Sequence, residues 1–250
     1  MTQESRSDGD FQDSASAVHG LCQNRGMSVS VLEREMYSEA EAARLLRVPR
    51  PTLHYWLEGK VYGGREHPPV IRPEPTGKKT VTWAEFVESA LLSQYRRRRV
   101  PLDHVRQFIL ILREKTGVPY PLAHERPWAI SQHLMILDAQ RSADLPDEYM
   151  LYAPVNDQRM LLPPARDFLD RVKFEDDEAV LWRPAGKNSL VVIDPERRSG
   201  RPCVGGISTA VINEYADDGY SYQEIADEFG LEVREVEMAV AYELTSKTAA

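Results

Sequence analysis

The chain has 250 residues, of which 42% are hydrophobic and 28% are charged, and its formal net charge at pH 7 is −8. This composition is typical of a globular protein with a sizeable core, and it excludes a chain that is disordered throughout. The N-terminus, MTQESRSDGD, is polar, and the longest apolar run covers only residues 108–112, so we expect neither a signal peptide nor a membrane span. The two cysteines, Cys22 and Cys203, are far apart in the sequence, which argues against a disulfide framework and predicts a cytoplasmic protein.

Residues 1–30 are rich in Ser, Asp, Gln and Gly and have almost no apolar periodicity, so we predict a disordered tail. Met27 is an alternative to Met1 as the true start of the chain. Residues 31–120 show the periodicity of helices, interrupted by one interval rich in Pro and Gly.

The stretch YSEAEAARLLRVPRPTLHYWLEG, residues 37–59, predicts a helix-turn-helix. Ser38 followed by Glu41 is the spacing of a capping box, and Val48-Pro49 is suited to the turn. Leu53 is the expected apolar anchor of the second helix. The side chains expected to face outward, toward phosphates and base edges, are Arg50, Thr52, His54 and Tyr55.

The segment after this unit predicts a wing. Residues 69–83 are expected to form a hairpin about Glu74-Pro75-Thr76-Gly77 that carries Arg72, Lys78 and Lys79. Two amphipathic helices are expected within 83–99 and 101–115. Residues 37–120 contain fifteen basic and nine acidic residues, a balance that attracts a polyanion. The order of elements is therefore that of a winged helix that binds duplex DNA.

The same stretch resembles the N-terminal domain of MerR-type regulators. The matching residues are Tyr37, Thr52, Leu53, Tyr55 and Trp56. Two positions depart from the pattern of that family: Arg47 stands where a glycine usually makes the turn, and His54 replaces an arginine. The resemblance implies a DNA-binding domain over 31–120.

Residues 121–198 are expected to form a β-rich middle region. Short apolar stretches alternate there with turn residues, and hairpin turns are predicted at Asn156-Asp157 and Gly186-Lys187-Asn188. Residues 163–172 predict a helix opened by proline. The acidic run FEDDE, residues 174–178, is interpreted as a solvated turn in preference to a metal site.

Residues 199–250 predict three helices after a loop rich in Gly and Pro. Ala226, Gly230 and Val236 have the spacing of a second helix-turn-helix, yet this unit contains ten acidic and three basic residues. A negative charge of this size opposes DNA, so we expect the unit to bind protein. Val236, Met238, Ala239 and Val240 are expected to leave apolar surface for a partner. A capping bundle without a partner is the plainer alternative.

Residues 194–243 resemble domain of unknown function 433. The match rests on Arg201-Pro202, Gly205-Gly206, Val211-Ile212, Asp218-Gly219, Ile225, Val236 and Ala241-Tyr242. Together with a DNA-binding N-terminus, this architecture is similar to VapB-like antitoxins of type II toxin–antitoxin modules. That resemblance implies a repressor of its own promoter whose partner is a PIN-like ribonuclease toxin.

The expected protein has an α+β fold with four units, covering 1–30, 31–120, 121–198 and 199–250. It is expected to be a homodimer on an operator in duplex DNA and to have no enzymatic activity, because no catalytic motif is recognisable. No cofactor and no metal is expected. The alternative is a MerR-type regulator that senses a small molecule through its middle region, which a roomy apolar pocket between 121 and 198 would favour.

Overall fold

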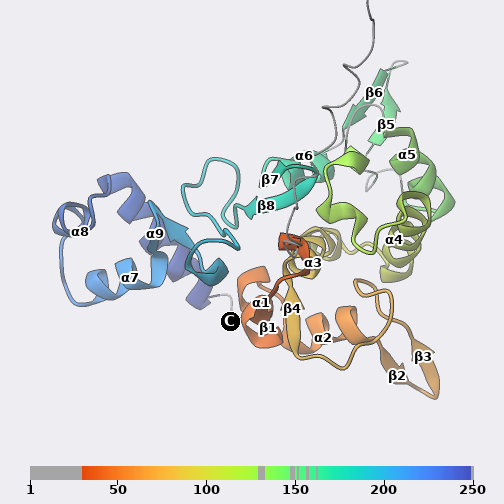
Figure 1. Ribbon diagram of the computed structural model, residues 1–250, viewed down its shortest axis with the longest axis horizontal. Coiled ribbons are helices and arrows are strands. Elements are labelled where there is room, and N and C mark those ends of the chain that lie inside the picture. Colours follow the sequence, from red (N-terminus) through yellow and green to blue (C-terminus); the bar gives the residue numbers. More distant parts are fainter. Residues whose placement is uncertain are drawn as a thin grey trace, which may run out of the picture.

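The computed structural model describes residues 30–128, 133–146, 150, 152–155, 158–161 and 163–248. It shows a mixture of helices and small antiparallel sheets (Figure 1), as the α+β prediction requires. The tail expected over 1–30 lies outside the described residues except for Ser30. Within the described part of the chain, no helix combines the length and the apolar character that crossing a bilayer demands.

The N-terminal part contains a short 3₁₀ turn, η1, and then four strands and four helices. In chain order they are η1 (Val31–Glu33), β1 (Glu35–Ser38), α1 (Glu39–Leu46), α2 (Arg50–Glu58), β2 (Lys60–Tyr62), β3 (Arg65–His67), β4 (Thr80–Thr82), α3 (Trp83–Arg97) and α4 (Leu102–Thr116). β1 pairs with β4 in antiparallel fashion, and β2 pairs with β3. The pairing of β1 and β4 places the start of α1 beside Lys79 and the start of α3 beside Arg34.

The hairpin expected over residues 69–83 is not formed. Val70 and Ile71 donate their backbone N–H groups to the carbonyl of Trp56, and the chain then runs as a loop to β4. The local hairpin is instead β2–β3, which turns at Gly63-Gly64, and it extends away from the body beyond α2 (Figure 1). Both glycines have positive φ, 59° and 74°. This is the backbone that a two-residue hairpin turn needs, and glycine adopts it without steric cost.

The middle part consists of short helices and two hairpins. Its elements are η2 (Pro121–Ala123), η3 (Arg126–Trp128), α5 (His133–Ser142), β5 (Tyr152–Val155), β6 (Gln158–Leu161), α6 (Pro163–Leu169), β7 (Val172–Glu175) and β8 (Glu178–Trp182). β5 pairs with β6 across the turn predicted at residues 156–157, which are themselves outside the described residues. The helix predicted from 163 is confirmed as α6. The FEDDE run forms the end of β7 and the tight turn to β8.

The three helices predicted in the C-terminal part are confirmed. After a turn, η6 (Arg198–Gly200), a two-residue ladder joins β9 (Cys203–Val204) to β10 (Ile207–Ser208). The helices are α7 (Thr209–Asp217), α8 (Tyr222–Phe229) and α9 (Val233–Thr248). They gather at one end of the molecule (Figure 1).

Two separate cores hold these parts together. The larger core runs from Leu32 to Ile193 and combines residues of the N-terminal and middle parts. For example, the Trp83 indole stacks on Phe86, with ring centroids 5.5 Å apart, and donates its N–H to the carbonyl of Ala179. The boundary expected at residue 120 therefore crosses a continuous core. The smaller core contains residues from Val191 to Tyr242.

Polar contacts join the C-terminal part to the N-terminal part. The Tyr37 hydroxyl donates to the carbonyl of Gly200 at 2.8 Å, and Arg34 donates to the carbonyl of Pro195 at 3.0 Å. The end of α9 lies against the turn after α1 (Figure 1), where Arg47 donates to the hydroxyl of Thr245 at 3.0 Å. The two cores are therefore connected by polar contacts at the α1–α2 unit.

Candidate functional site

The helix-turn-helix predicted at 37–59 is present as α1 and α2. Ser38 caps α1 by accepting the backbone N–H of Glu41 at 3.2 Å. Arg47 follows α1 with φ 55° and ψ 48°, the left-handed conformation that a glycine takes at this place in related units. For an arginine this conformation costs about 1 kcal/mol. The chain therefore builds the expected turn with an unfavourable residue, and the contacts of Arg47 with α9 offset part of that cost.

The outward side chains of α2 are organised by a buried carboxylate. Glu39, at the start of α1, is 2% exposed. One of its oxygens lies 2.9 Å from Nδ1 of His54, and the other lies 4.0 Å from Nε of Arg50. The side chains of Arg50 and His54 remain 61% and 41% exposed. Glu39 therefore orients two predicted contact residues while leaving them open to solvent.

Thr52 and Tyr55 are half-buried on α2. The Tyr55 hydroxyl accepts a hydrogen bond from Arg106 of α4 at 3.1 Å, and the ammonium group of Lys60 lies 4.5 Å from the centre of its ring. Tyr55 therefore anchors the start of the β2–β3 hairpin as well as bordering the outer face of α2.

The β2–β3 hairpin adds a second surface next to α2. Val61 and Tyr62 are 71% and 74% exposed, and Lys60 and Arg65 are exposed beside them. The sequence contains its signal, because Gly63-Gly64 separates two short stretches of strand-forming and polar residues. Sequence reasoning misses the hairpin because the Pro-rich interval at 68–75 competes with it as the place of the wing.

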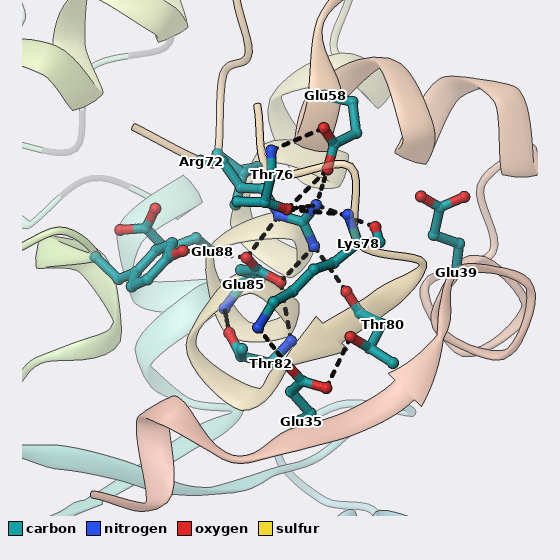
Figure 2. A network of polar contacts seen from close by, with 12 residues as sticks. Glu35, Glu39, Glu58, Arg72, Thr76, Lys78, Thr80, Thr82, Glu85 and Glu88 are labelled. Atoms are coloured by element: carbon teal, nitrogen blue, oxygen red, sulfur yellow. Dashed lines mark hydrogen bonds and ion pairs between the residues drawn. The ribbon is translucent and has the colours of Figure 1, made fainter. Parts of the chain in front are cut away.

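Arg72 requires a correction, since it was expected on the surface of the wing. It is 1% exposed, and Figure 2 shows its guanidinium at the centre of a polar network. Nε and Nη2 donate to the two carboxylate oxygens of Glu85 at 2.7 and 3.2 Å. Nη1 forms an ion pair with Glu58 at the end of α2. A guanidinium held in this way cannot reach a DNA phosphate, so Arg72 has a structural role.

This network fixes the loop between β3 and β4. Arg72 also donates to the hydroxyl of Thr76 and to the carbonyl of Thr80, both at 2.7 Å. Burial opposes the charge of Arg72, but its hydrogen bonds to Glu85 and the negative charges of Glu85 and Glu58 outweigh burial and raise its pKa. Glu58 in turn accepts the backbone N–H groups of Thr76 and Gly77, each at 2.9 Å.

The two predicted lysines are on this loop and are exposed. The Lys78 ammonium group lies 2.6 Å from a carboxylate oxygen of Glu35 on β1 (Figure 2). The backbone carbonyl of Lys79 accepts the N–H of Glu39 at the start of α1. Lys79 thus reaches solvent close to the α1–α2 unit, whereas Lys78 would have to leave an acidic partner to contact a phosphate.

A second buried carboxylate, Glu88, lies behind the network on α3. One of its oxygens accepts the N–H of Leu122 at 2.9 Å, and the other is 3.8 Å from Nη2 of Arg113. Burial raises the pKa of Glu88 to about 7, although the charge of Arg113 acts in the opposite direction. Glu88 therefore gains or loses a proton near neutral pH.

The second helix-turn-helix is formed by α8 and α9. Ser221 and Glu224 make a reciprocal capping box, and Gly230 takes the left-handed conformation at the turn, with φ 65°. Ala226 and Val236 are buried between the helices. The expectation that Val236, Met238, Ala239 and Val240 leave apolar surface requires correction, since Val236, Ala239 and Val240 are buried in the core of this part and Met238 packs against it. The exposed large apolar side chains here are Val211, Tyr220, Tyr222 and Leu244.

The described residues do not assemble a metal site. They contain no group of three or more His, Cys, Asp and Glu side chains placed to hold an ion. In the acidic turn after β7, Asp177 is 3.3 Å from Nδ1 of His124, and its carbonyl accepts the N–H of Glu125. The turn is therefore tied to the segment after η2.

Comparison with known proteins agrees with this two-part architecture. Residues 191–242 match the family described as "Protein of unknown function (DUF433)". This range coincides with the smaller core. The class defined by fold and match is thus a protein with the two helices α1 and α2 near one end and a C-terminal part that matches the DUF433 family.

The whole chain has relatives in Mycobacterium tuberculosis (strain ATCC 25618 / H37Rv). It is 35% identical to "Uncharacterized protein Rv2308" over 226 residues, which cover 86% of this chain and 93% of that protein. The chain belongs to the family of that protein. It is also 28% identical to "Putative antitoxin VapB45" over 212 residues, which cover 78% of this chain and 88% of that protein.

A solved structure has the same fold. The crystal structure of Rv2018 from Mycobacterium tuberculosis matches this chain with a TM-score of 0.67 and 26% sequence identity. The match covers 84% of this chain and 99% of the other, so it includes more than either helix-turn-helix alone.

Proposed function

We propose that the chain is the antitoxin of a type II toxin–antitoxin module. It binds an operator in duplex DNA through α2 and the β2–β3 hairpin, represses its own promoter, and holds a PIN-like ribonuclease toxin through its acidic C-terminal part. The relative named "Putative antitoxin VapB45", aligned over 88% of its length, supports the antitoxin role. The PIN-like identity of the toxin and the homodimer rest on the resemblance and on the two-fold symmetry of operators.

The observation that carries DNA binding is the placement of α2 beside the hairpin. Arg50 and Thr52 lie at the start of α2, where a recognition helix contacts base edges. The hairpin begins two residues after the end of α2. A cation–π contact between the Lys60 ammonium group and the Tyr55 ring holds the hairpin against α2. Lys60, Arg65 and Tyr62 are thus presented where they can contact the DNA backbone next to the groove.

The alternative, a regulator that senses a small molecule, gains little support from the cavities. An open groove of about 1120 Å³ lies between β7–β8 and the segment from 192 to 206, and Ser30, Arg34 and a series of other polar residues line it. Charged side chains on that lining include Lys173, Glu178 and Arg197. Such a lining differs from the enclosed apolar pocket that binds small molecules.

Substitutions in α2 and in the hairpin are expected to affect DNA binding differently. Thr52→Ala and Arg50→Ala should change the preferred base, with a loss of discrimination of about 1–3 kcal/mol for each base contact. Lys60→Ala combined with Arg65→Ala should weaken binding to all sequences and flatten the log–log salt slope by about 0.9 for each phosphate that is no longer neutralised. The measurement is a fluorescence anisotropy titration at several salt concentrations. It compares a duplex from the protein's own promoter with a duplex of the same composition in scrambled order.

Arg234→Ala provides the matched control, because it removes an exposed arginine from the acidic C-terminal part. It should leave both the base preference and the salt slope unchanged. If the control weakens DNA binding as much as the hairpin variant does, the interface does not lie on α2 and β2–β3.

The C-terminal part is expected to bind the toxin and not DNA. A fragment of residues 190–248 contains the whole smaller core, so it is expected to fold alone. Exposed carboxylates, including Glu232 at the start of α9, repel phosphate over roughly 8–10 Å at ordinary salt. The fragment should therefore not retard the operator duplex in a gel shift, yet it should co-purify with a PIN-like protein encoded next to it. Retardation of the duplex at physiological salt would refute this division of roles.

A further inference from the structure

A small pocket lies where four segments of the protein meet. It has a volume of about 50 Å³ and is bounded by the end of α1, the last turns of α3, the start of β7 and the chain after β8. Three arginines line it, Arg47, Arg97 and Arg171, and none of its lining residues is acidic. In a chain of net charge −8 this is a marked local excess of positive charge.

The three arginines have no carboxylate partner in the described part of the chain. Arg97 and Arg171 donate only to the backbone carbonyls of Leu46 and Pro184, each at 3.4 Å. The neighbouring carboxylate of Asp167 is 3.3 Å from Arg98. Arg171 is half-buried, whereas Arg47 and Arg97 are exposed at the mouth of the pocket. The cluster therefore differs from the ion pairs around Arg72, in which a buried guanidinium contacts two carboxylates.

One of the residues that line the pocket has a polar atom without a partner. Nε2 of Gln94 is buried from solvent on the wall formed by α3, and no acceptor lies within hydrogen-bond distance of it. The Arg171 guanidinium lies 6.0 Å from the centre of the Trp182 ring, which holds it in place. Burial and then the charge of Arg97 lower the pKa of Arg171, although the charge of Asp167 acts in the opposite direction.

We propose that this pocket binds a phosphate group. The planar guanidinium forks of Arg97 and Arg171 and the amide N–H of Gln94 are donors, and phosphate oxygens accept from such donors at short range. The space admits one phosphate group and is too small for the backbone of a duplex. The ligand is therefore free inorganic phosphate or the phosphomonoester of a small molecule such as a nucleotide.

Binding at this point has a structural consequence. Arg47 belongs to the turn between α1 and α2, Arg97 to α3 and Arg171 to the segment that enters β7. A bound phosphate would join these three segments and brace the α1–α2 unit against the middle part. The inference does not depend on the proposed antitoxin role.

The test uses the full-length protein. Inorganic phosphate should raise its Tm and give a saturable isotherm in calorimetry, whereas sodium chloride at the same ionic strength should do neither. Arg97→Gln and Gln94→Leu should each weaken phosphate binding by about tenfold or more. Arg99→Gln, which removes the same charge from an exposed side chain outside the pocket, should leave it unchanged. Gln94→Leu alters no charge, so its effect separates a built site from general attraction.

Two further arms decide the source of the phosphate group. Adenosine monophosphate binding more tightly than inorganic phosphate, with no binding of adenosine, would assign the site to a phosphomonoester, and equal binding would assign it to the free anion. The proposal fails if phosphate acts no differently from chloride, or if Arg99→Gln loses as much binding as Arg97→Gln. It also fails if Arg97→Gln changes only the affinity for DNA. Circular dichroism of each variant verifies folding, and Gln94→Leu alone decides the result if Arg97→Gln does not fold.

Discussion

Arg72→Met is expected to lower the free energy of unfolding by about 3–5 kcal/mol. The substitution removes a guanidinium that is 1% exposed and leaves the carboxylates of Glu85 and Glu58 without their main counter-charge. Methionine fills much of the same volume, so the loss in free energy of unfolding comes mainly from the broken polar network and not from a cavity. Urea denaturation at neutral pH, followed by far-UV circular dichroism, gives the value.

Lys78→Met is the matched control. It removes a positive charge from the same loop, but the Lys78 side chain is 63% exposed and its ion pair with Glu35 is solvated. Such a pair contributes at most about 1 kcal/mol. If the two variants lose the same stability, the buried network is not what holds this loop, and our structural assignment of Arg72 is incorrect.

Glu88→Gln is expected to change how stability depends on pH. Because the pKa of Glu88 is raised from 4.5 to about 7, the folded protein keeps a proton that the unfolded chain has already lost over this range. The wild-type protein therefore loses stability as the pH rises from about 4.5 to about 7, by about 3 kcal/mol from this group. Glutamine cannot ionise, so the variant gains this amount relative to the wild type across the same window.

Denaturation curves at several pH values from 4.5 to 8 test this expectation. The quantity to compare is the change with pH in the difference between variant and wild type, because any effect of the substitution on packing is the same at every pH and does not enter that change. Glu114→Gln, which alters an exposed glutamate on α4, should show no comparable change. A difference for Glu88→Gln that is constant with pH would contradict the expectation.

The predictions for Arg72 and Glu88 concern buried groups that lie under the proposed DNA-binding surface. Glu85 accepts from Arg72 on one side and from the Tyr120 hydroxyl at 3.1 Å on the other. Arg113, the partner of Glu88, also donates to the carbonyl of Ile71 at the start of the loop. Substitutions here are therefore expected to affect DNA binding only to the extent that they loosen α2 and the loop.

Local sequence signals predicted the helix ends and turns that depend only on residues adjacent in the sequence. The capping residue Ser38 and the turn residue Gly230 located helix ends because helix ends are satisfied by their nearest neighbours. The wing was misplaced for a related reason. The Pro-rich interval and Gly63-Gly64 are both turn signals, and the sequence alone does not say which one lies between paired strands.

The roles of charged residues were less predictable than the elements that carry them. Arg72 and Lys78 are six positions apart on one loop, yet the first is buried and the second is exposed. The difference arises because Glu58 and Glu85, from α2 and α3, converge on Arg72. Glu39 was not predicted to have a role, and the only available signal was its position one residue after the Ser38 cap.

Sequence patterns were sufficient to establish the α+β class, the helices of both helix-turn-helix units, and the segregation of basic and acidic charge between the two ends. These features depend on local propensity, capping and composition, which are properties of short segments. Tertiary packing was needed to establish that β1 pairs with β4, that side chains as far apart as Leu32 and Ile193 share one core, and that Arg47, Arg97 and Arg171 meet around one pocket. Contacts between residues so far apart in the chain depend on how whole elements pack, and no short segment encodes them.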